Sequence, residues 1–243
     1  MKTKILALLI LFSMKGFSQD TLEMPKLRSQ LFSLSPISKK VNEVNGLVFG
    51  IGHIDNKRIA SQKINGINIE ANPAPAAGAL IAFISLMYLP EIIQKNKVSD
   101  SLKNTEDYYK IKDMKHTPNL KLNGLNISSG CFFTTTSMNG LNISVGNKFK
   151  DFNGISITAL GTIASNQNGF SMGIYNRNNN LTGSSFGVYN QSYDLKGVHI
   201  GLINRTRKNS GLQIGVFNQS NSRGLQLGVW NVNNKRSLPF FNW

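Results

Sequence analysis

The residues best suited to acid–base or metal chemistry are few and widely spaced in this chain of 243 residues. Histidine occurs at His53, His116 and His199, without the Cys or carboxylate spacing that a zinc site needs. The single cysteine, Cys131, cannot form an internal disulfide, and nothing places a histidine beside it. We therefore expect no catalytic residues, no metal site and no cofactor, and we interpret the chain as non-enzymatic.

Acidic residues give no clearer indication of catalysis. Asp20, Glu23, Asp55 and Glu70 could form acid pairs in principle, but nothing distinguishes them from ordinary surface charge. The sequence contains neither a phosphate-binding loop nor the Gly-x-Ser-x-Gly turn of a hydrolase. No small-molecule substrate is indicated.

Aromatic and basic residues together can bind sugars or bases by stacking. The candidates are the aromatic residues Tyr175, Tyr189, Phe217 and Trp230 and the basic residues Arg177, Arg205 and Arg223. They recur with an internal repeat, so packing between neighbouring strands is the simpler interpretation.

The repeat organises most of the chain. Gly-Leu-Gln-Ile-Gly-Val-Phe-Asn at 211–218 is followed by Gly-Leu-Gln-Leu-Gly-Val-Trp-Asn at 224–231. Repeat units begin 13 to 16 residues apart, at Gly124, Gly140, Gly154, Gly169, Gly183, Gly197, Gly211 and Gly224. Within each unit the pattern alternates with period two, which predicts strands. One face is steadily aliphatic, and we expect either lipid or a protein core to cover it.

Two positions in the later units have a predicted structural role. Small residues at the fifth position predict strong curvature or close approach of another element, and they are Gly173, Gly187, Gly201, Gly215 and Gly228. Asparagines at the eighth position are expected to end strands and start turns, and they are Asn176, Asn190, Asn204, Asn218 and Asn231.

The rest of the chain divides into segments of different composition. Residues 1–19 have the basic start, short apolar run and small polar end of a secretory signal peptide. Residues 20–43 form a polar N-terminal segment, and residues 44–243 form one repeat domain. An insertion at 73–119 interrupts that domain, and its uncharged run at 76–89 is expected to form one short helix.

We predict an all-β fold, an antiparallel meander of about 10–12 short strands that closes into a barrel. A β-solenoid, in which each repeat is one coil, is the alternative. The barrel is favoured because connections such as Arg205–Ser210 offer no apolar residues to a solenoid core.

The repeats and the ending Leu-Pro-Phe-Phe-Asn-Trp at 238–243 resemble bacterial surface-repeat proteins of Gram-negative envelopes. This resemblance implies an exported protein of the outer membrane or cell surface and brings no reaction with it. The formal net charge is +15, or +12 once Lys2, Lys4 and Lys15 of the signal peptide are subtracted, which agrees with an anionic partner, and solvated loop charge is the alternative. We expect outer-membrane lipid or lipopolysaccharide, with other envelope proteins as further candidates and no nucleic acid. An adhesin-like module that binds glycan or lipopolysaccharide is the alternative.

Overall fold

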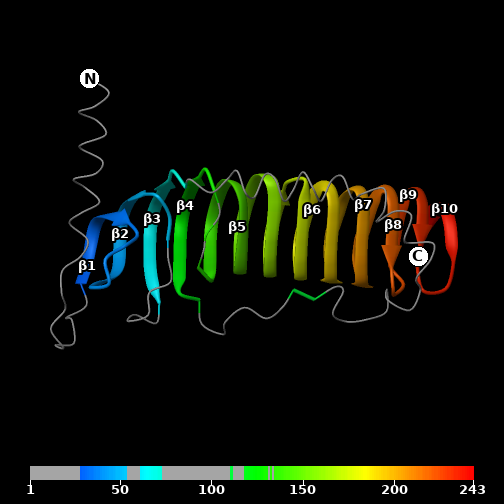
Figure 1. Ribbon diagram of the computed structural model, residues 1–243. Helices are drawn as coiled ribbons and strands as arrows, with labels where there is room; N and C mark the ends of the chain where they lie inside the picture. Colours follow the sequence, from blue (N-terminus) through cyan, green and yellow to red (C-terminus); the bar gives the residue numbers. More distant parts are fainter. Residues whose placement is uncertain (1–27, 54–60, 73–109, 112–117, 131, 133) are drawn as a thin grey trace, which may run out of the picture.

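The computed structural model describes residues 28–53, 61–72, 110–111, 118–130, 132 and 134–243. All the regular structure in these residues is β, in one sheet whose ten strands lie side by side in chain order (Figure 1). The strands are β1 (Arg28–Ser35), β2 (Val41–Gly50), β3 (Gln62–Glu70), β4 (Leu120–Ser128), β5 (Thr136–Met172), β6 (Tyr175–Leu195), β7 (Val198–Asn209), β8 (Leu212–Ser220), β9 (Leu225–Val232) and β10 (Ser237–Asn242).

Strand pairing shows that the fold is a solenoid. Every neighbouring pair from β1 to β9 is parallel, and only β10 runs antiparallel to its neighbour β9. The chain therefore winds as about 11 stacked coils, and the long strands β5 and β6 continue around bends of the coil (Figure 1). The all-β prediction is confirmed. The predicted antiparallel meander and closed barrel are wrong, and the β-solenoid alternative is confirmed.

The repeats stack in register because equivalent residues lie directly above one another. Gly66, Gly124 and Gly140 pair in succession across β3, β4 and β5. At Gly140 the φ angle is 135°, and a Cβ there would collide with the backbone of Gly124. A side chain at this bend would therefore push the coils apart.

Asparagines beside these glycines connect the coils on the outside. Asn139 donates a hydrogen bond of 2.7 Å to Asn123, and Asn153 donates one of 2.7 Å to Asn139. Because these residues bond to their equivalents in the neighbouring coil, the Asn-Gly pairs belong to the strands. They are not hairpin turns.

The interior changes along the solenoid axis. In the N-terminal coils it is apolar, built from residues such as Val48, Ile64, Leu122, Phe149 and Phe152. In the C-terminal coils many of the inward side chains are amides and hydroxyls. The apolar part therefore supplies hydrophobic stabilisation, whereas the polar part depends on satisfied hydrogen bonds.

The connections expected to be loops are also part of the coils. Residues 205–209 belong to β7, and Thr206 and Asn209 within them are buried. A solenoid was disfavoured above on the assumption that its interior must be apolar on every side. That assumption fails because polar side chains line the interior here.

Several expectations fall outside the described residues. These are the signal peptide at 1–19 and the short helix at 76–89. Of the insertion, only residues 110–111 and 118–119 are described. Within the described part of the chain, no helix has the length and hydropathy needed to cross a bilayer.

Candidate functional site: an exposed aliphatic face

The aliphatic residues of the repeat point outward. Ile200 is 38% exposed and Leu202 is 54% exposed, whereas His199 and Asn204 of the same coil are fully buried. The chain itself does not cover this face, so the expected cover by a protein core is wrong, whereas the expected cover by lipid stays a prediction. The polar residues occupy the interior.

These outward residues align into two rows on one face of the solenoid, which we call the outer aliphatic face. Strand pairing places equivalent residues beside one another between successive strands, and the bonds from Asn153 to Asn139 and from Asn168 to Asn153 continue the same stacking within β5. One row holds Leu47, Ile67, Leu125, Leu141, Ile155, Phe170, Val198, Leu212 and Leu225, with the polar Ser184 between Phe170 and Val198. The other holds Phe49, Ile69, Ile127, Ile143, Ile157, Met172, Phe186, Ile200, Ile214 and Leu227.

The size of this face sets it apart from ordinary surface. Ten coils at about 4.8 Å each, and a width of four or five residues, give roughly 600–800 Å². The largest apolar patch on a typical monomer covers about 300–600 Å² and is often functional. Covering the face would gain on the order of 15 kcal/mol before the costs of association. An apolar surface of this size indicates an interaction site.

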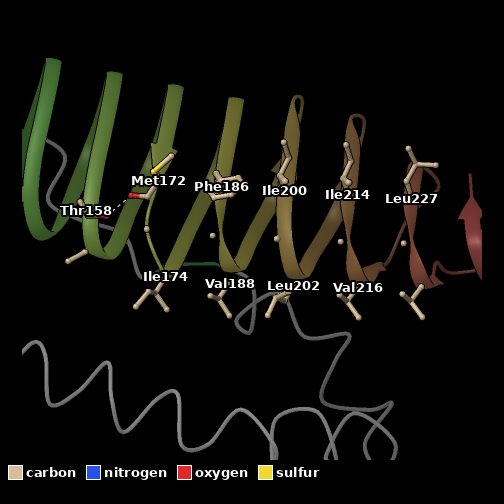
Figure 2. A pocket seen from close by; sticks show the side chains of 17 residues that line it. Thr158, Met172, Ile174, Phe186, Val188, Ile200, Leu202, Ile214, Val216 and Leu227 are labelled. Carbon is tan, nitrogen blue, oxygen red and sulfur yellow. Dashed lines mark hydrogen bonds between the residues drawn. The ribbon is translucent and has the colours of Figure 1, made fainter.

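A groove runs along one edge of the outer aliphatic face, with a volume of about 1000 Å³. Its floor consists of the predicted small positions, Gly173, Gly187, Gly201, Gly215 and Gly228. One wall is the row from Met172 to Leu227, and the opposite wall, which we call the corner row, is Ile174, Val188, Leu202, Val216 and Val229. Figure 2 shows the two rows projecting on either side of the bend. The chain therefore bends at these glycines, where curvature was predicted. The same bend forms the floor of the groove.

The asparagines of the eighth position lie inside the solenoid behind this groove. Asn190 donates a hydrogen bond of 2.9 Å to Asn204, which donates one of 2.8 Å to Asn218. Asn176 and Asn231 extend this ladder at its two ends. All five are fully buried. Their predicted role in ending strands and starting turns is wrong. They connect coils instead.

Four of the five ladder asparagines also satisfy the backbone of a groove wall. The amide nitrogen of each donates to the carbonyl oxygen of a wall residue in the next coil, at 2.9 Å for Asn190 to Ile200 and 2.8 Å for Asn204 to Ile214. Asn176 and Asn218 make the same bond to Phe186 and Leu227. The carbonyls of this wall are thus hydrogen-bonded from within, so the groove presents mainly hydrocarbon.

A second buried polar column lies beneath the outer aliphatic face. It passes through Ser185, His199, Gln213 and Gln226, which pair from coil to coil. His199 Nε2 lies 2.9 Å from the Ser192 hydroxyl, and burial lowers its pKa from 6.5 to about 3. Near neutral pH this histidine is therefore neutral and acts as one more polar residue of the column.

The other residues considered for chemistry are dispersed. His53 and Glu70 form a buried contact of 2.9 Å in the N-terminal coils, far along the chain from His199. Asp20, Glu23, Asp55, His116 and Cys131 lie outside the described residues. Among the residues that the structure describes, no three His, Cys, Asp or Glu side chains come together as metal ligands.

The predicted aromatic and basic residues do not all lie on the surface of the protein. Tyr175 stacks on Tyr189, with ring centroids 5.3 Å apart, and Arg205 is buried. Arg207 and Lys208, which the sequence offers as candidate cations for binding, join Lys110 in a cluster that could not be predicted, with the three cations 5.0–5.8 Å from the ring of Tyr193. The repeat pattern contains no signal for this cluster, because Lys110 belongs to the insertion.

Comparison with known proteins gives no assignment: no family profile, curated protein or solved structure matches the chain.

Proposed function

We propose that this protein is a non-enzymatic repeat scaffold of the cell envelope that acts by interaction, with membrane lipid as its partner. The single observation that carries the proposal is the outer aliphatic face. Its residues are exposed although the same strands carry amides and hydroxyls that occupy the interior.

Physical chemistry favours lipid as the partner. The hydrocarbon interior of a bilayer can cover an aliphatic surface, because neither of the two has hydrogen-bonding groups to satisfy. The formal charge of +12 that remains after Lys2, Lys4 and Lys15 of the expected signal peptide are subtracted from +15 adds attraction to anionic headgroups. Export of the chain, and location at the outer membrane or cell surface, form part of this proposal and rest on the sequence features of residues 1–19 and of the repeat.

Co-sedimentation with vesicles tests the proposal. The full chain should bind vesicles of phosphatidylcholine and phosphatidylglycerol, and Leu225→Glu should weaken binding by about tenfold or more because a charge then faces the bilayer. Leu225 is 48% exposed, so folding tolerates the change.

Asn234→Glu is the matched control, since it adds the same charge at an exposed position in the turn between β9 and β10. It should bind like the wild type. The proposal fails if the wild type ignores these vesicles, or if Leu225→Glu and Asn234→Glu bind equally well.

A second candidate function is a secreted module that binds glycan or lipopolysaccharide, and the cations around Tyr193 favour it. Charge reversal at Arg207 and Lys208 should then weaken binding to lipopolysaccharide in a salt-dependent way. Arg205 is unsuitable for this test because it is buried. Binding that is unchanged by both reversals would exclude this candidate.

A further inference from the structure

We infer that the glycine-floored groove binds one extended acyl chain of a membrane lipid, laid along the solenoid axis. This inference rests on the proposed function, because it names what part of the lipid the groove receives. The outer aliphatic face would meet the bilayer as a surface, whereas the groove would hold a single chain.

The shape of the groove fits a long, narrow occupant. Its floor runs across consecutive coils from Gly173 to Gly228, and the walls stand on both sides of that line (Figure 2). Because strand spacing in a sheet is about 4.8 Å, five coils give a length of roughly 20–25 Å. A straight hydrocarbon chain matches that form.

The floor is bare backbone, and the packing behind it requires glycine. A Cβ at Gly201 would lie 2.6 Å from the amide nitrogen of Asn190 and 3.2 Å from the amide oxygen of Asn204. A Cβ at Gly215 would lie 2.5 Å from the amide nitrogen of Asn204. The buried ladder and the backbone of the neighbouring coil therefore require glycine at the bend, so the groove is floored by backbone between its two apolar walls.

The chemistry of the groove excludes occupants that need hydrogen bonds. The wall carbonyls of Ile200 and Ile214 already accept hydrogen bonds from Asn190 and Asn204. An extended peptide would leave its own amides without partners here, at about 1–3 kcal/mol for each buried group. A glycan would face the same cost at its hydroxyls. A hydrocarbon chain has no such groups to satisfy.

Binding of fluorescently labelled palmitate, which represents the acyl chain, tests the inference. The wild type should bind it saturably, and Leu202→Glu should weaken binding by about tenfold or more, because a carboxylate then stands in the apolar wall. Val216→Glu, in the same corner row, repeats the test should Leu202→Glu not fold. Leu225→Glu, on the outer aliphatic face and outside the groove, is the matched control and should bind palmitate as the wild type does.

The outcomes separate the two proposals. The groove assignment is overturned if the wild type takes up no palmitate, or if Leu202→Glu and Leu225→Glu bind it alike. Self-association of the chain that palmitate does not reverse would also overturn it, by assigning the groove to a second copy. If vesicle binding still falls in Leu225→Glu, the proposed membrane function survives the loss of the groove assignment.

Discussion

The asparagine ladder should be far more important for stability than the aliphatic row beside it, and Asn204→Ala measures this difference. Asn204 accepts a hydrogen bond from Asn190 and donates to Asn218 and to the carbonyl of Ile214, at 2.8–2.9 Å. Alanine removes all three bonds in a position that is fully buried. The amide of Asn190, the amide oxygen of Asn218 and the carbonyl of Ile214 then each lose a partner.

The expected loss is about 3–5 kcal/mol, from roughly 1 kcal/mol for each bond plus the cost of leaving buried polar groups unsatisfied. Leu202→Ala in the same coil is the control. Leu202 is 54% exposed, so its truncation should cost less than about 1 kcal/mol. Equilibrium unfolding in urea gives both values.

A larger loss for Leu202→Ala than for Asn204→Ala would refute this reasoning. It would mean that the aliphatic row forms the core and that the asparagines face solvent. Equal m-values for the two variants would show that both report on the same unfolding transition.

Two further predictions concern the polar interior. His199→Gln, which places at this position the residue found in the next two coils, should flatten the pH dependence of stability. The unfolded histidine titrates near 6.5 and the folded one near 3, so its stability contribution is complete above pH 6.5 and is lost as pH falls toward 3. Thermal unfolding between pH 7 and 4 checks this, and an unchanged slope in the variant would contradict it. Gly201→Ala should destabilise by about 2–3 kcal/mol, because the new methyl group overpacks against the carbonyl oxygen of Gly187 in the neighbouring coil and against the ladder at Asn190. If this variant unfolds in urea with the same free energy as the wild type, the bend has space for the methyl group and the prediction is wrong.

The repeat and its glycines could be predicted from the sequence because they depend on local geometry. Period two identifies strands, and regular spacing from Gly169 to Gly224 identifies equivalent units. The alternation also separates Ile200 from His199 correctly into different environments. These features do not depend on how the strands pair.

Which face of each strand points into the solenoid could not be predicted in the same way. Burial of Asn204 is unfavourable by itself and becomes favourable only when parallel coils place Asn190 and Asn218 within hydrogen-bonding distance. An antiparallel meander would place these residues at different heights, so the same asparagines would then suit turns. The choice therefore depends on long-range pairing, which no single repeat contains. The preference for burying aliphatic residues misled the prediction, because it ignores the energy of a satisfied polar ladder.

The placement of polar residues inside and aliphatic residues outside is the central claim, and thiol labelling at two adjacent positions tests it most directly. In a chain whose single natural cysteine, Cys131, is replaced by Ser, a new cysteine is introduced at Ile214 or at Gln213. Ile214 is 37% exposed and Gln213 is fully buried. The folded protein without lipid should react with a maleimide quickly at position 214 and slowly at position 213. Fast labelling at 213 with protection at 214 would contradict the account.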